Sequence, residues 1–259
     1  MVRSIDSLSF ALALFVGMVI CLEIGRRLGA RALAKDPKAG KSAGAAVEGS
    51  IFGLYALLLA FTFSGAPSRL DARKQLVTEE ANAIGTAYLR LDLLRADSQP
   101  AMRDLFRKYT DSRLAVFRKA DDLEAAYKEL AVSTKFQQEI WSKAVADTAL
   151  PGNHPDAGKL LLPALNSMID ITTTRTTAAL IHPPAIIFGL LFMLALVCSM
   201  LAGHSMAESP GRKWLHITGF SLITVISVFV ILEIEFPRRG WINFLDSSDQ
   251  VMVDLRNSM

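Results

Sequence analysis

Cysteine and histidine are scarce in this sequence, and their placement argues against several kinds of site. The 259 residues include two cysteines, Cys21 and Cys198, and both lie within apolar stretches. A disulfide framework is therefore not expected, and reduced, packed thiols are. The histidines have neither the paired spacing nor the cysteine partners of a zinc site; they are His154, His182, His204 and His216. We expect no metal site and no cofactor.

Signatures of catalysis and of nucleic-acid binding are also absent. The sequence has no GxSxG elbow, no phosphate-binding loop and no dinucleotide-binding fingerprint. An acidic group, Asp121, Asp122 and Glu124, is more typical of a helix start than of a metal site. The formal net charge is only +3, which does not indicate a nucleic-acid surface. We therefore predict neither an enzyme nor a nucleic-acid-binding protein.

Long apolar runs are what the sequence does contain. Hydrophobic residues make up 51% of the chain and charged residues 20%, and no strand periodicity appears. Four runs are long and apolar enough to cross a bilayer as helices, at about 7–22, 47–66, 183–202 and 214–236. We therefore predict an all-α membrane protein with four transmembrane helices and a helical extramembrane domain between the second and the third. The predicted domain boundaries are 1–66, 67–182 and 183–259.

Helical periodicity continues through the polar part of the chain. A long helix to about residue 94 is predicted by an apolar stripe at steps of three, four or seven, namely Leu70, Val77, Ala81, Ile84, Tyr88 and Leu91. Ser98 is a candidate N-cap for a helix over about 101–119, and Asp121 and Asp122 could start another. Residues 151–158 read as a loop, followed by a helix from about Pro163.

The second apolar run has two distinct faces. One is smooth, because small residues recur at steps of three or four: Gly49, Gly53, Ala56, Ala60 and Ser64. Small-residue faces let membrane helices approach closely, so we expect this face to pack against another helix. Roughly opposite lie Ile51, Tyr55, Leu58 and Thr62. That second face is either a packed or lipid-facing surface or the wall of a pore.

Charged residues near the ends of the apolar runs each allow two interpretations. Glu48 begins the second run, where the helix dipole favours a carboxylate, and in an oligomer it would repeat as an acidic ring. Glu233 and Glu235 end the fourth run, and Arg238 and Arg239 follow just past Pro237. Either these glutamates pair with the nearby arginines at the interface, or Glu233, if buried, is an intramembrane acid that binds an ion or proton. Two interpretations are open for Arg69, Arg73 and Glu80. They could form ion pairs between subunits that fix the transition from the membrane to the polar domain, or they could simply lie on a solvated helix face.

Three stretches resemble a known family. The residues 60–94, 165–175 (LNSMIDITTTR) and 233–242 (EIEFPRRGWI) are similar to the bestrophin-like family of bacterial membrane proteins, long catalogued as a domain of unknown function. A more distant likeness is to the bestrophins, pentameric ion channels whose second membrane helix lines the pore and ends in a Phe-containing stretch before an Arg-rich helix. The matching positions are Phe61, Arg69, Ala72, Arg73 and Lys74. The spacing between the two arginines is one residue shorter here, both tryptophans of that pattern are missing, and no acidic calcium-binding cluster has a counterpart.

The resemblance implies a homo-oligomer, a pentamer by analogy, in the inner membrane of a bacterium. Its partners would be the lipid bilayer, further copies of the chain and inorganic ions. The expected pore residues are Glu48, Ile51, Tyr55, Leu58 and Thr62. The alternative is a non-conducting sensor or interaction protein whose helical domain binds a partner or a ligand.

Overall fold

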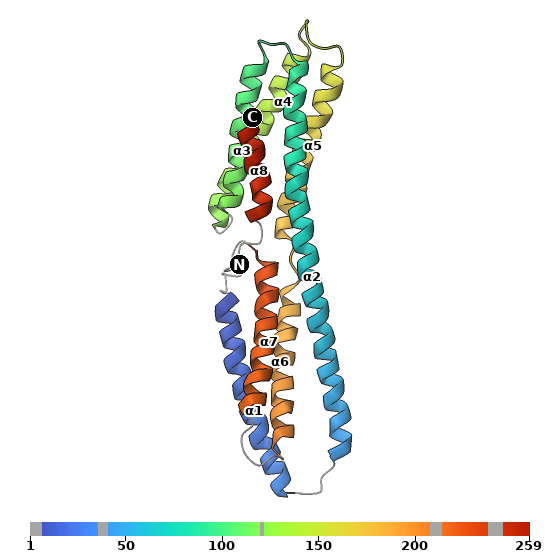
Figure 1. The fold of residues 1–259 in the computed structure, drawn as a ribbon, viewed down its shortest axis with the longest axis vertical. Coiled ribbons are helices and arrows are strands. Elements are labelled where there is room, and N and C mark those ends of the chain that lie inside the picture. The colour runs from blue at the N-terminus through green and yellow to red at the C-terminus, as the bar shows by residue number, and fades with distance from the viewer. Residues whose placement is uncertain (1–6, 36–40, 120–121, 208–213, 238–245) are drawn as a thin grey trace. The chain divides into compact units, whose positions relative to one another are not determined.

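The computed structural model describes residues 7–35, 41–119, 122–207, 214–237 and 246–259. All secondary structure within these ranges is helical (Figure 1), which confirms the all-α prediction. The helices are α1 (Ser7–Lys35), α2 (Lys41–Leu89), the 3₁₀ helix η1 (Arg90–Leu93), α3 (Gln99–Arg118), α4 (Leu123–Thr148), α5 (Ala157–Leu180), α6 (Ala185–Met206), α7 (Trp214–Glu235) and α8 (Asp246–Ser258). Four apolar spans long enough to cross a membrane lie in the described residues: in α1, in α2, in the segment Ala157–Met206 that includes α6, and in α7.

The chain forms two compact units. Unit 1 comprises Met1–Arg69 and His182–Ile242, and unit 2 comprises Leu70–Ile181 and Asn243–Met259. α2 contributes residues to both, since it continues through Pro67 without ending. The break between α5 and α6 lies at His182-Pro183-Pro184, where the proline rings disfavour helical backbone for the residue before each.

Unit 1 is held together mainly by α1, which packs against α6 and α7. The approach of α1 to α6 depends on glycine. A methyl group at Gly25 would overlap the Met200 carbonyl oxygen, and one at Gly203 would overlap the Leu22 carbonyl oxygen. Small residues on α1 and α6 therefore allow a close helix–helix contact inside the chain. Beside it, Leu14 is fully buried in an apolar cluster with residues of α2, α6 and α7.

Unit 2 is a helical bundle whose core begins with the stripe predicted on the long helix. All six predicted positions are buried: Leu70, Val77, Ala81, Ile84, Tyr88 and Leu91. Phe106 from α3, Ile140 from α4 and Leu165 from α5 complete the same apolar cluster. The hydrophobic period of a helix thus identified the buried face before any partner was known.

Helix starts in unit 2 follow the predicted caps in part. Asp122 caps α4, because its Oδ1 accepts hydrogen bonds from the backbone N–H groups of Glu124 at 3.0 Å and Ala125 at 3.2 Å; Asp121 lies outside the described residues. Ser98 precedes α3 as expected but makes no side-chain cap bond. α5 begins at Ala157, ahead of the predicted start, and contains Pro163 within its first two turns.

The C-terminal residues form α8, which belongs to unit 2. Met252 of α8 is buried in the core of that unit, and Leu255 packs against it. Arg256 donates to both carboxylate oxygens of Asp111 on α3, at 2.7 and 2.9 Å. α8 packs there because it is amphipathic, so its apolar face is buried against the apolar core of unit 2.

Candidate functional site

One face of α2 is covered by the rest of unit 1, and it is the face expected to line a pore. Tyr55 is 5% exposed and Thr62 8% exposed, while Ile51 and Leu58 are half-buried. Phe52, on the flank of this face, meets Phe220 of α7 edge to face, with ring centroids 6.1 Å apart. Within one chain this geometry favours a packed surface for these residues.

The opposite part of α2 is open. Gly49 and Gly53 have open space where a side chain would begin, and Ala56, Ala60 and Ser64 are exposed with them. In the most apolar window of α2 only 11% of the residues are buried, against 28–39% in the other three spans. Of the apolar spans in the described residues, α2 is therefore the one its own chain covers least.

Beside the small residues, large apolar side chains share the open part of α2. Leu54, Leu57 and Phe61 are 51%, 52% and 67% exposed. Each turn of a helix spans 3.6 residues, so this row lies about a quarter-turn or more from the row of small residues. The open part of α2 thus has a smooth strip and a bulky strip side by side.

Glu48 lies near the start of α2 and is half-buried. Its carboxylate accepts a hydrogen bond of 2.6 Å from the Ser205 hydroxyl near the end of α6. The bond ties α2 to α6 at one end of unit 1.

Glu233, the suspected intramembrane acid, is buried. It is 1% exposed, and its Oε1 accepts a hydrogen bond from the Ser7 hydroxyl at the start of α1. A buried carboxylate inside an apolar span is costly unless it is bonded, which makes such a residue a candidate for a role in ion or proton binding.

Glu235, two residues on, is buried and lies at the centre of an ion cluster whose other members are partly exposed. Its Oε2 accepts two hydrogen bonds from Arg69, from Nε at 2.9 Å and from Nη2 at 2.7 Å. His182 Nδ1 lies 3.0 Å from Glu235 Oε1. The His182 and Phe236 rings pack against each other at a tilt, with their centroids 4.6 Å apart. Arg69 therefore has its counter-ion inside the chain, on α7, while Arg238 and Arg239 lie outside the described residues.

Arg73 and Glu80 also find their partners within the chain, both in unit 2. Arg73 donates to the carbonyl oxygens of Ala178 at 3.3 Å and Ile181 at 2.8 Å. These carbonyls end α5, where the helix leaves acceptors without backbone partners and where a cation is favourable. Arg73 therefore caps the C-terminal end of α5 within its own chain.

Glu80 forms the most deeply buried ion cluster of the described residues. One oxygen accepts from Arg113 Nε at 2.5 Å and the other from Arg175 Nη1 at 2.6 Å. Glu80 and Arg113 are 0% exposed and Arg175 4%. The three side chains join α2, α3 and α5, and Arg175 also reaches Asp249 of α8 at 3.5 Å.

The electrostatics of this cluster keep Glu80 ionised. Burial by itself raises the pKa of Glu80, but the positive charges of Arg113 and Arg175 outweigh it and hold that pKa below its usual value. Phe117 further stabilises the positive charge of Arg175 by a cation–π contact, since the guanidinium lies 3.4 Å from the centroid of its ring. The cluster is thus an ion pair network that fixes the relative positions of three helices.

The sequence model of the Bestrophin-like domain matches residues 13–243. The chain belongs to the bestrophin-like family. No curated protein and no solved structure matches it. Membership makes the chain a membrane protein related to the bestrophin channels, and the family is associated with channels rather than with enzymes. The resemblance stated from the sequence is confirmed.

Sequence reasoning missed part of the two ion clusters around Glu80 and Glu235. It named Glu80 but not Arg113, and it named Arg69 and Glu235 without pairing them or adding His182. Arg113 lies one helical turn after Tyr109 on the apolar face of α3, and a cation on an apolar face is the signal that could have been used. The pairing itself has no sequence signal, because the partners are 33 and 166 positions apart.

Proposed function

We propose that the chain is an oligomeric ion channel whose pore is lined by α2. The family supports this, since it is associated with channels rather than with enzymes. The observation that carries the proposal is the open part of α2. Among the apolar spans of the described residues, α2 is the one with the smallest share of its residues buried by the rest of the chain. A helix in that position contacts lipid, another copy or a water-filled passage.

The two strips of α2 suggest how copies would assemble. Small residues are enriched where membrane helices touch, because they let backbones approach. On α1 the same kind of strip, with Gly25, meets α6 within the chain. The strip with Gly49 and Gly53 on α2 has no such neighbour among the described residues. We assign it to the contact with a neighbouring copy around an axis, in a ring that is a pentamer by analogy with bestrophins.

The bulky strip beside it then faces the axis. Leu54, Leu57 and Phe61 would form an apolar constriction that closes by expelling water and opens when it is wetted. This moves the wall from Ile51, Tyr55, Leu58 and Thr62, which unit 1 covers, to the adjacent open face. Glu48 stays near one mouth of the pore.

Current measurements on the protein reconstituted in planar bilayers test whether Leu54, Leu57 and Phe61 line the pore. Leu57→Ser should raise the leak current, because a hydroxyl favours a hydrated constriction. Leu190→Ser is the matched control, since Leu190 is an exposed leucine of α6 at 40%. A larger current from Leu58→Ser than from Leu57→Ser would reverse the assignment of faces. Equal, near-zero currents from all versions would count against a pore.

The runner-up is a non-conducting sensor or interaction protein, and a pocket in unit 2 favours it. The two functions differ in stoichiometry, because a central pore requires a closed ring of α2 helices whereas a sensor can work as a monomer or dimer. Measuring the mass of the purified protein in mild detergent separates them. A monomer or dimer would exclude the ring.

A further inference from the structure

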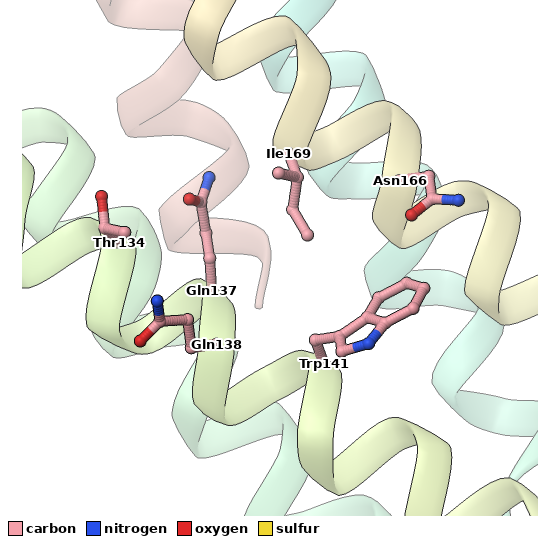
Figure 2. Close-up of a pocket in the computed structure, with 6 residues that line it drawn as sticks. All are labelled: Thr134, Gln137, Gln138, Trp141, Asn166 and Ile169. Atoms are coloured by element: carbon pink, nitrogen blue, oxygen red, sulfur yellow. The ribbon is translucent and has the colours of Figure 1, made fainter.

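Unit 2 has a pocket between α4 and α5 that neither the channel proposal nor the family explains. Its volume is about 370 Å³, near the lower end of the range for small-molecule sites. Figure 2 shows Gln137 and Trp141 extending from α4 toward α5, with Asn166 and Ile169 on the facing helix. The lining is completed by Thr134 and Gln138.

The Gln137 amide at the wall of the pocket has a fixed orientation. The Thr172 hydroxyl donates to the Met168 carbonyl at 3.0 Å, so its oxygen can only accept from its other neighbours. Gln137 Nε2 supplies one of those bonds at 3.1 Å and gives another of 3.1 Å to the Tyr109 hydroxyl. Both amide protons are therefore used inside the bundle.

The consequence is a free acceptor on a buried side chain. Gln137 is 7% exposed, and among the described residues its carbonyl oxygen has no hydrogen-bond partner. An acceptor held in one orientation by two bonds, on a residue that lines a pocket, is a pre-organised hydrogen-bonding group. Such a group can accept a hydrogen bond from an occupant of the pocket.

The other lining residues restrict the chemistry of that occupant. Gln138 and Asn166 are carboxamides whose polar atoms likewise have no partner in the part of the chain that the structure describes. Trp141 and Ile169 supply an indole and an aliphatic surface, and no lining residue is charged. Indole faces bind flat rings by stacking, and carboxamides pair with adjacent donors and acceptors on the edge of such a ring.

We propose that this pocket binds a planar, uncharged heteroaromatic small molecule of the nucleobase or lactam class. Its ring stacks against Trp141, a ring N–H donates to the Gln137 carbonyl oxygen, and its remaining edge pairs with Gln138 or Asn166. The absence of lining charge disfavours carboxylates and phosphates. The inference does not depend on conduction, so a failure of either proposal leaves the other standing.

Uracil is the probe, and the full-length protein in mild detergent is the sample. Replacing Trp214 and Trp241 by Phe leaves Trp141 as the reporter, whose fluorescence should be quenched saturably. The expected dissociation constant is about 10 mM or tighter, given the usual binding efficiency per heavy atom. Two analogues serve as controls: 1,3-dimethyluracil has the same ring without N–H donors, and orotate adds a carboxylate.

Substitutions place the binding in the pocket. Asn166→Ala removes an exposed side chain without a partner, so the fold should survive and uracil binding should weaken by about three- to tenfold. Asn82→Ala, an exposed asparagine on α2 away from the pocket, should leave binding unchanged. No saturable quenching by uracil, equal binding of 1,3-dimethyluracil, or equal effects of the two variants would each overturn the proposal.

Discussion

Replacing Glu80 by Gln should strongly destabilise unit 2. The change keeps the shape of the side chain and removes its charge. Glu80 accepts one charge-assisted hydrogen bond from Arg113 and one from Arg175, at 2.5 and 2.6 Å, and the carboxylate is 0% exposed. Glutamine has one acceptor oxygen, so its NH₂ group must face one of the two arginines, donor against donor.

The size of the effect follows from the burial. Breaking a buried ion pair by removing one partner costs about 3–5 kcal/mol, because the other charge stays buried without compensation. Two guanidinium groups share that loss here, and the Arg113 Nη atoms are already buried without a partner in the described residues. For a chain of this size the cost corresponds to a fall in melting temperature of roughly 6–20 °C.

Thermal unfolding of the purified protein, followed by circular dichroism, measures the effect. Glu79→Gln is the matched control, since Glu79 is exposed and, among the residues that the structure describes, bonds only Gln75, at 2.8 Å. It should change stability by less than about 0.5 kcal/mol. If Glu80→Gln melted within a degree or two of Glu79→Gln, the buried network would not be what holds α2, α3 and α5 in place.

Three further outcomes follow from the same structure. Folding lowers the pKa of Glu80, so the stabilisation by its carboxylate is fully present above the unfolded pKa of about 4.3 and is lost as the pH falls through the folded pKa. The difference in melting temperature between wild type and Glu80→Gln should therefore shrink over that acidic range. Gly203→Leu should disrupt the α1–α6 contact and lower the yield of folded protein on size exclusion, whereas Gly219→Leu, which meets open space, should not. Asn153→Ala should cost about 1–3 kcal/mol in thermal unfolding, because this side chain bonds the Arg95 N–H and the Asp147 and Leu150 carbonyls; an effect no larger than that of Asn166→Ala would contradict this.

Most of the helical architecture could be predicted from the sequence, because it rests on local signals. The apolar runs gave the four spans, and the stripe from Leu70 to Leu91 gave the buried face of the long helix. The Asp122 cap is a signal of three residues and was found. The early start of α5 was missed because a proline inside the first turns of a helix reads as its beginning.

The arrangement of charges could not be predicted, because it depends on which faces meet. Glu80 and Arg175 carry no mark in the sequence that distinguishes them from a solvated helix face, and they are 95 positions apart. Burial turns the pair into a structural network, since a charge in the bundle must be neutralised. Likewise the pocket is lined by residues of both α4 and α5, so no local pattern in the sequence marks it.

The two small-residue strips carry the main lesson about function. In α1 the small residues Gly17, Cys21, Gly25 and Gly29 recur at steps of four, as the small residues of α2 recur at steps of three or four. Both patterns are typical of a helix face that packs closely. The structure supplies the partner for α1, which is α6 of the same chain. It supplies none for Gly49 and Gly53 among the described residues. If the strip on α2 has the same physical cause as the strip on α1, its partner belongs to another copy, so the mass of the assembled particle bears directly on whether α2 can surround a pore.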